Sequence, residues 1–214
     1  MAGYVVFLAG GTASGKSFVA RVLEEKGARR IDLDVLSREV LAPHSPLLAK
    51  LQAAFGADLV GPDGHLDRAL LATRAFVSKE KTQLLEALEL PAIKACLEEK
   101  LQEYAQDISD REQKGAGRVP CIVEVPLLDK LGALINLADE VVCVVAPYDL
   151  RCSRAVARGM APEDFVRRVA QQPRDEYLVA HATTVLDNSR DEDFLIAQIH
   201  AWWNEREKMG WKAQ

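Results

Sequence analysis

Residues 10–17 read GGTASGKS and combine glycines with a lysine and a hydroxyl group, a set of groups suited to binding phosphate. Gly10 and Gly15 let the backbone turn tightly, so that successive N–H groups point at phosphate oxygens. Lys16 supplies a positive charge for the β- and γ-phosphates, and Ser17 offers a hydroxyl ligand to Mg²⁺. The stretch matches G-x-x-x-x-G-K-[ST] in full and predicts a phosphate-binding loop (P-loop) for a nucleoside triphosphate.

This loop requires a buried strand before it and a helix after it. Residues 4–9 form a compact apolar run typical of a strand, and residues 16–26 have helical spacing with Gly27 behind them. These flanks argue against the alternative, a chance glycine-rich turn. The predicted nucleotide contacts are Gly10, Gly11, Thr12, Ala13, Ser14, Gly15, Lys16, Ser17 and Phe18.

Two aspartates close the second predicted strand, which begins near residue 28 and ends at Asp32. In an open parallel sheet, ligands bind outside the carboxyl ends of the strands. Asp34 could therefore accept or orient the proton of an acceptor hydroxyl, a role that contributes about 10²–10⁴-fold in rate. The alternative for Asp34 is a helix N-cap. Asp32 is expected to support the loop or a Mg²⁺-bound water.

A third predicted strand, residues 121–125, carries Glu124 near its carboxyl end. Glu124 is positioned to hold Mg²⁺ through water, and with Ser17 it forms the predicted metal set. The alternative is a structural carboxylate that pairs with Lys16.

Arginines gather after the fourth predicted strand, residues 140–146. Arg151, Arg154 and Arg158 are three and four residues apart and share a helix face. Arg167 and Arg168 follow on a second predicted helix, after a Gly-Met-Ala-Pro break. These arginines favour a helical lid over about 149–175, whose charges stabilise a phosphoryl transition state. The alternative is a solvated basic face.

Strands and helices alternate along the chain, with a fifth predicted strand over 183–187 and a last helix from residue 191 onward. This order predicts an α/β P-loop NTPase fold with a five-stranded parallel sheet flanked by helices. Residues 36–104 are predicted to be helical throughout with a kink or break near Pro91, and the polar run 106–117 to be a surface loop. We expect one domain with its core at 1–35 and 119–214, and a helical substrate-binding insertion at about 36–118.

Composition limits the classes of function. The chain has 214 residues, 27 Lys and Arg, 32 Asp and Glu, and a net charge of −5, which disfavours bulk nucleic-acid binding. We see no transmembrane run or secretory leader and no spacing of the four histidines suited to zinc. The four cysteines contain no C-x-x-C pair and are expected to be reduced. The expectation is a cytoplasmic enzyme without membrane or nucleic-acid partners, as a monomer or weak homo-oligomer.

The absence of a guanine-reading N-K-x-D motif argues against a GTPase, although residues 129–132 match the loose D-x-x-G pattern. The motifs instead suit a small-molecule kinase. Several further short stretches follow the loop in order: IDLDVLSR at 31–38, FG at 55–56, DGHLDRALL at 63–71, AF at 75–76, LEALELPAI at 85–93, PLL at 126–128, RAVAR at 154–158, RVAQQ at 168–172 and VLDNS at 185–189. Their order and spacing resemble those of the dephospho-coenzyme A kinase family over nearly the whole chain.

The resemblance implies transfer of the γ-phosphoryl group of ATP, with Mg²⁺, to the 3′-hydroxyl of the ribose of dephospho-coenzyme A. It implies Asp34 as general base, with Lys16, Arg154 and Arg158 as the other catalytic residues, and Asn188 near the adenine of ATP. The residues implied for the acceptor site are Asp32, Arg38, Arg68, Phe76, Pro126 and Leu127.

Four positions depart from the family pattern: Ala13, Leu90, Lys130 and Gly159. Ala13 stands where the family usually has glycine, and we expect its φ to be negative because a Cβ disfavours positive φ. The other departures lie mostly on the acceptor side. They leave open a nucleotide-binding relative with a lost or altered acceptor site, or a kinase acting on another nucleoside or nucleotide.

Overall fold

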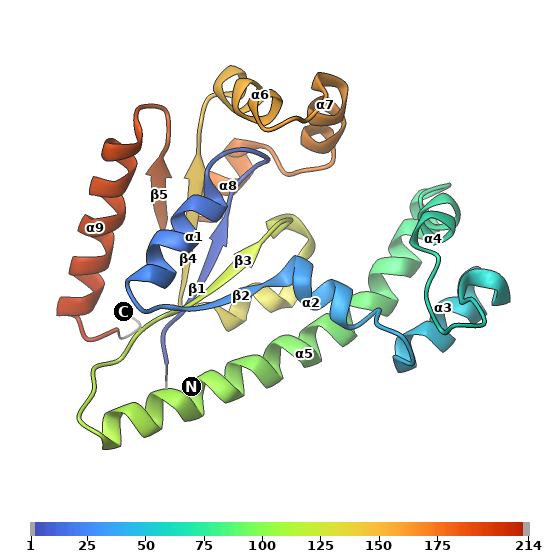
Figure 1. Cartoon of the computed structure of the whole chain (residues 1–214), viewed down its shortest axis with the longest axis horizontal. Helices are drawn as coiled ribbons and strands as arrows, with labels where there is room; N and C mark the ends of the chain where they lie inside the picture. Colours follow the sequence, from blue (N-terminus) through green and yellow to red (C-terminus); the bar gives the residue numbers. More distant parts are fainter. Residues whose placement is uncertain (1–2, 212–214) are drawn as a thin grey trace. The chain divides into compact units, whose positions relative to one another are not determined.

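The computed structural model describes residues 3–211. Its five strands form one parallel sheet in the order β2-β3-β1-β4-β5, which confirms the predicted fold class (Figure 1). The strands are β1 Val5–Ala9, β2 Arg29–Asp32, β3 Cys121–Val125, β4 Glu140–Val145 and β5 Thr184–Asp187.

The α-helices are α1 Lys16–Glu25, α2 Leu33–Glu39, α3 Pro46–Phe55, α4 Arg68–Ala75, α5 Lys79–Gln113, α6 Tyr148–Ala157, α7 Pro162–Ala170, α8 Asp175–His181 and α9 Glu192–Lys208. Three short 3₁₀ helices are η1 Ala57–Leu59, η2 Leu128–Lys130 and η3 Gly132–Leu137. Within residues 3–211, no helix combines the length and apolar character needed to cross a bilayer.

The chain divides into two compact units. The first contains the residues up to Asp32 and those from Leu101 onward, and the second is Leu33–Lys100. The second unit therefore differs from the expected insertion of 36–118 mainly at its C-terminal boundary. Residues 101–113, at the end of α5, belong to the first unit, where the Tyr104 hydroxyl donates to the Val119 carbonyl at 2.7 Å and accepts from the Tyr4 N–H at 2.9 Å.

Helix α5 corrects two expectations. It runs without interruption through Pro91 and ends at Gln113, so a break at Pro91, one of the two predicted alternatives, is wrong, as is much of the predicted loop at 106–117. Leu101, Tyr104 and Ile108 are buried at helical spacing. This spacing indicates a helix, but the polar composition of residues 106–117 made it hard to recognise. The block 36–104 is also not continuously helical, because an isolated antiparallel bridge between Val60 and Leu66 separates η1 from α4.

The central strands of the first unit's sheet, β1, β3 and β4, are buried on both faces. Val6 and Leu8 pack in one cluster with α1 and α9, while Val5 and Phe7, which alternate to the opposite face, are buried as well. A separate core holds the second unit together, with Leu51 of α3, Leu59 of η1 and Leu71 of α4 at its centre. Burial on both faces explains why the strands read as near-continuous apolar runs.

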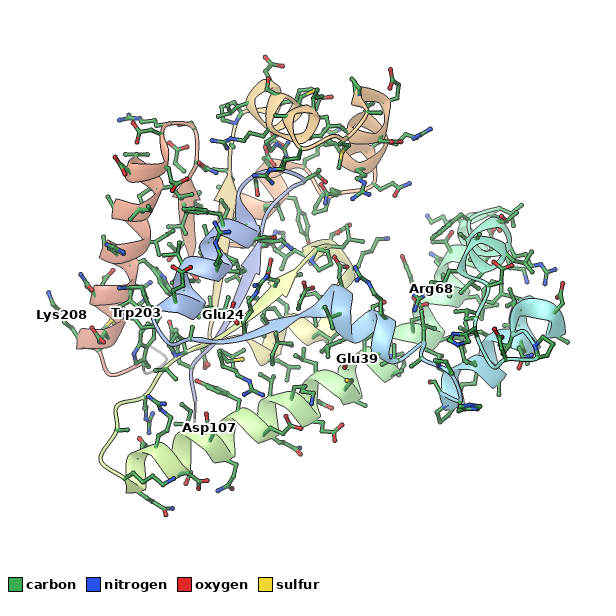
Figure 2. All side chains as sticks on the ribbon, viewed as in Figure 1. Glu24, Glu39, Arg68, Asp107, Trp203 and Lys208 are labelled. Atoms are coloured by element: carbon green, nitrogen blue, oxygen red, sulfur yellow. The ribbon has the colours of Figure 1, made fainter. Side chains whose placement is uncertain are left out.

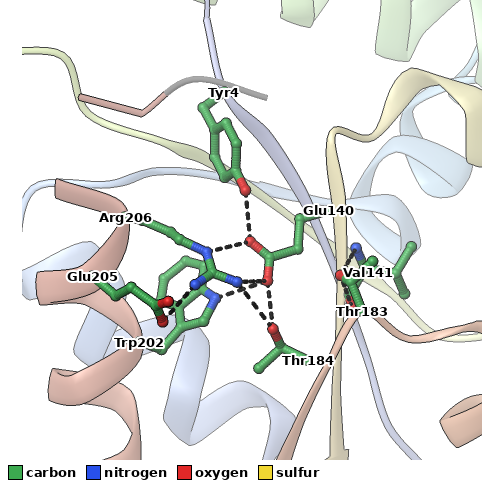
Figure 3. Close-up of polar contacts among 8 residues, drawn as sticks. All are labelled: Tyr4, Glu140, Val141, Thr183, Thr184, Trp202, Glu205 and Arg206. Atoms are coloured by element: carbon green, nitrogen blue, oxygen red, sulfur yellow. Dashed lines mark hydrogen bonds and ion pairs between the residues drawn. The ribbon is translucent and has the colours of Figure 1, made fainter. Parts of the chain in front are cut away.

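The buried carboxylate of Glu140 fastens α9 to the sheet (Figure 3). It accepts hydrogen bonds from the Tyr4 hydroxyl at 2.7 Å, the Trp202 indole at 3.0 Å, the Thr184 hydroxyl at 2.5 Å and the Arg206 Nη2 at 2.8 Å. Burial alone would raise the pKa of Glu140, but these donors outweigh it and hold the pKa below its ordinary value.

Candidate active site

The phosphate-binding loop joins β1 to α1 and has the strand–loop–helix context that its motif requires. Gly15 precedes α1 with φ of 105°, a left-handed conformation that favours glycine. A Cβ on Gly15 would lie 2.2 Å from the Asn188 Nδ2, so a side chain there would also clash. The Ser14 hydroxyl is buried and has no hydrogen-bond partner within the described chain, which leaves it available to a ligand in the loop.

Ala13 corrects one expectation about this loop. Its φ is 60°, in the left-handed region, whereas we expected a negative value. The loop needs this turn to continue towards Lys16, and its geometry prevails over the preference of a residue with a Cβ. Such a conformation costs about 1–2 kcal/mol for an L-residue other than glycine.

A buried carboxylate lies beside the loop lysine and serine. Glu124 on β3 is 1% exposed, and its Oε2 lies 3.2 Å from the Ser17 hydroxyl and 3.9 Å from the Lys16 Nζ. Glu124 therefore lies next to Ser17, the other residue of the predicted metal set, and also pairs with Lys16 as the alternative expected. Its other oxygen, Oε1, accepts from Arg30 on β2, with distances of 2.7 Å to Nε and 2.5 Å to Nη2.

Arg30 was not among the residues predicted for the site, although its spacing from Asp32 indicated its position. Arg30 and Asp32 are two residues apart on one strand and so share a face of the sheet. The register pairs Asp32 with Glu124 on the neighbouring strand, which brings both acidic residues to the same edge. The loop that follows β3 begins with Pro126 and Leu127, both half-buried, at this carboxyl edge.

Both the phosphate-binding loop and α6 are hydrogen-bonded to Asn188, which is buried just after β5. Its Nδ2 donates to the Ser14 carbonyl at 2.7 Å, while its backbone carbonyl and its Oδ1 accept from Arg154 at 3.1 and 3.2 Å. Burial and the charge of the neighbouring Arg158 lower the pKa of Arg154, but an arginine remains charged at neutral pH. Asn188 therefore connects α6 to the phosphate-binding loop.

A solvent-open hollow of about 120 Å³ lies beside this junction. Its walls include Phe18 and Leu195 on the apolar side and Arg154, Arg158 and Asn188 on the polar side. A cavity of about 150 Å³ accommodates benzene, so this volume is on the scale of one flat ring. An aromatic group carrying polar edges would match both kinds of wall.

The two arginines of α6 and Arg158 just after it have different environments, although their spacing predicted one shared helix face. Arg151 is buried, lies against the Gly11 backbone and pairs with Asp175 at 3.4 Å. Arg154 binds Asn188, as described above. Arg158 follows the last residue of α6 and is exposed, and Arg167 and Arg168 on α7 are exposed as well.

The second unit carries the remaining predicted residues. Helix α2 begins at Leu33, so Asp34 is exposed in its first turn, and the residue before the helix is Asp32 rather than Asp34. Arg68, labelled in Figure 2, opens α4 and donates from Nη2 to the Arg38 carbonyl at 3.4 Å. Phe76 follows α4 and is 66% exposed. The side chains of Asp34, Arg68 and Phe76 are all exposed to solvent.

Glu89 is a further polar group that sequence reasoning missed. It lies on α5 within the second unit, where burial and the nearby charge of Glu86 raise its pKa and the charge of Arg68 lowers it, with a net upward shift. An acidic residue with a perturbed pKa beside a predicted acceptor-binding arginine belongs among the residues to test.

A parallel sheet, a phosphate-binding loop between its central strand and a helix, and a buried carboxylate beside the loop lysine and serine define a P-loop nucleotide-binding protein. Comparison with known proteins narrows this class. Residues 4–193 match the profile of the family described as dephospho-CoA kinase. The chain belongs to this family, and it is accordingly a kinase, a transferase enzyme.

Individual relatives agree with this assignment. The dephospho-CoA kinase of Corynebacterium efficiens is 40% identical over 192 residues, covering 89% of this chain and 91% of the relative. That of Streptomyces avermitilis is 39% identical, covering 92% and 91%. A crystal structure from Thermus thermophilus superposes with a TM-score of 0.76 at 28% identity, covering 96% of this chain and 98% of the other. The Campylobacter jejuni dephospho-CoA kinase shares the fold, with a TM-score of 0.68, 24% identity and coverage of 95% and 97%.

Proposed function

We propose that this enzyme transfers the γ-phosphoryl group of ATP to the 3′-hydroxyl of the ribose of dephospho-coenzyme A. The observation that carries the proposal is the cluster of Lys16, Ser17 and Glu124 at the start of α1, in a chain of this kinase family. Lys16 and the amino end of α1 bind the phosphates, because both are positive and both face the loop.

The oxygen atoms beside the loop fit Mg²⁺. The Ser17 hydroxyl and the Glu124 Oε2 are hard donors 3.2 Å apart, and hard oxygen donors are the ligands that this ion takes. Ser17 would bind the ion directly and Glu124 through water. When bound, Mg²⁺ neutralises the charge on the phosphates.

The adenine of ATP fits the hollow beside Asn188. Phe18 and Leu195 supply apolar contacts, and the charges of Arg154 and Arg158 face the same space. From there the triphosphate extends over the loop towards Lys16. Arg154 and Arg158 then stabilise the negative charge of the γ-phosphoryl group during transfer.

Asp34 accepts the proton of the acceptor hydroxyl in this proposal. The hydroxyl oxygen forms a bond to the γ-phosphorus while the bond from that phosphorus to the bridging oxygen breaks and ADP leaves. The proton passes to the Asp34 carboxylate and then to water. Asp32, Arg38, Arg68, Phe76, Pro126 and Leu127 hold the acceptor.

A coupled ADP-release assay with MgATP tests the proposal. The acceptors are dephospho-coenzyme A, adenosine and a nucleoside monophosphate, with GTP as an alternative donor. Turnover with dephospho-coenzyme A alone supports the proposed acceptor. ATP binding without turnover on dephospho-coenzyme A contradicts it, and Leu90 and Lys130, which depart from the family pattern, are then the first positions to change.

We also propose a cytoplasmic enzyme that acts on a small molecule without nucleic-acid or membrane partners, as a monomer or weak homo-oligomer. The net charge of −5 supports this setting, because bulk nucleic-acid binding and anionic membranes both require basic surfaces. Light scattering at micromolar concentration measures the oligomeric state, and a stable higher oligomer would contradict the proposal.

A further inference from the structure

The first half of the phosphate-binding loop is held by a side chain that is distant in the sequence. Gln172 lies in the short connection between α7 and α8, and its Oε1 accepts two hydrogen bonds from Thr12. The Thr12 backbone N–H donates at 2.7 Å and the Thr12 hydroxyl at 2.9 Å. One amide oxygen therefore fixes both the backbone and the side chain of a residue next to Ala13, whose φ is positive.

The neighbours of this contact restrict Thr12 further. Arg151 of α6 packs against Gly11 so closely that a Cβ there would lie 1.9 Å from its Nη1, and Arg151 also pairs with Asp175 at the start of α8. The Gln172 Oε1 lies 3.7 Å from the same Cβ position. Residues before and after α7 thus converge on Gly11 and Thr12.

This arrangement differs from an ordinary core contact. Gln172 is half-buried, and its side-chain oxygen reaches a loop that must present its amides to phosphate. Nearby α7 is largely exposed, with Phe165 its buried residue. Because most side chains of α7 are exposed, hydrogen bonds contribute much of what holds this segment to the loop.

We propose that Gln172 is a positioning residue that fastens the segment 158–174 to the phosphate-binding loop through Thr12 and thereby lowers the KM for ATP. Fastening keeps Thr12 in one conformation and keeps Arg158 near the loop, so that less ordering is required when ATP binds. The effect on KM rests on the proposed function, whereas the fastening itself does not.

The experiment compares Gln172→Ala, Gln172→Glu and Thr12→Val with the wild type. Gln171→Ala is the matched control, because Gln171 is the exposed neighbour of Gln172. Steady-state kinetics with dephospho-coenzyme A measure the KM for ATP and kcat. Limited trypsin digestion without ATP measures cleavage after Arg158, Arg167 and Arg168, which are exposed in the segment. The melting temperature of each variant reports the global fold.

Gln172→Ala should raise the KM for ATP about tenfold and speed cleavage of the segment by a similar factor, with kcat and the melting temperature little changed. Thr12→Val keeps the backbone donor and loses the hydroxyl, so its effect should be about threefold. Once Gln172 is Ala, adding Thr12→Val should cause no further increase in cleavage, which is measured without ATP. Gln172→Glu keeps the acceptor for both donors, so cleavage should match the wild type while the added negative charge raises the KM.

Wild-type values of KM and cleavage for Gln172→Ala would overturn the proposal, as would equal effects of Gln171→Ala. Rapid cleavage of Gln172→Glu would also overturn it, because that variant retains the hydrogen bonds. If Gln172→Ala fails to fold, the cleavage measurement on Thr12→Val, at the other end of the contact, carries the same test. A wild-type enzyme that does not phosphorylate dephospho-coenzyme A refutes the proposed function, while the cleavage measurements still decide the fastening.

Discussion

Arg30 and Glu124 form an ion pair between neighbouring strands, and the pair divides the two oxygens of the Glu124 carboxylate. Oε1 accepts from the guanidinium, which leaves Oε2 facing Ser17 and Lys16 at the phosphate-binding loop. A buried carboxylate without a partner is unfavourable, so Arg30 compensates the burial of Glu124.

Replacement of Arg30 by Gln should lower the free energy of unfolding by about 2 kcal/mol, because Glu124 loses its main counterion. The Arg30 side chain is 29% exposed, so the loss should fall below that of a fully buried pair. Urea denaturation measures the change. Arg29→Gln is the control, since its pair with Glu103 is half exposed on both sides and should be worth less than about 1 kcal/mol. Equal losses in the two variants would contradict the role of Arg30.

Asp34→Asn should reduce kcat by about 10²–10⁴-fold and leave ATP binding nearly unchanged, because the amide cannot accept the hydroxyl proton. The coupled assay gives kcat, and calorimetric titration with ATP gives the dissociation constant. Glu39→Gln, which removes an exposed carboxylate from the same helix, should have little effect. Retention of most activity by Asp34→Asn would show that another group takes the proton.

Ala13→Gly should stabilise the protein by about 0.5–1 kcal/mol. Glycine removes the cost of the positive φ at this position, and the greater entropy of the unfolded chain offsets part of the gain. Thermal or denaturant unfolding detects the change. The same substitution at Ala53, an exposed position within α3, should instead destabilise by about 1 kcal/mol. A loss of stability on Ala13→Gly would show that the loop carries no such strain.

The Glu140 network should make stability depend on pH in the acidic range. The folded state holds the pKa of Glu140 below its ordinary value of 4.5, so the unfolded chain binds the proton more tightly. The contribution is therefore complete above the ordinary value and is lost as pH falls through the folded-state pKa. Denaturant unfolding between pH 3 and 7 measures it.

Glu140→Gln should be less stable than the wild type at pH 7 and should show a weaker loss towards low pH. Thr184→Val, which removes one donor and leaves the carboxylate in place, is the control and should keep most of the pH dependence. An unchanged acid profile in Glu140→Gln would assign the dependence to other carboxylates.

The sequence by itself determined the local features of this protein. The positions of the five strands and α1 were predicted to within a few residues. Apolar runs marked the central strands, because these are buried on both faces, and helical spacing marked α1. The G-x-x-x-x-G-K-S pattern likewise specified the loop, since the motif is contiguous. The family resemblance rested on the order of short motifs, and the comparisons confirm it.

Only the tertiary structure decided which side chains meet. Arg30 and Glu124 are 94 residues apart, and Thr12 and Gln172 are 160 apart, so no local pattern joins them. The end of α5 read as a loop because its polar composition concealed a buried face, which packing on the first unit reveals. Ala13 adopted positive φ against its local preference, because closure of the loop around its own backbone required that turn. Local propensity determines which segments form helices and strands, whereas packing and hydrogen bonding across the sheet determine which side chains contact one another.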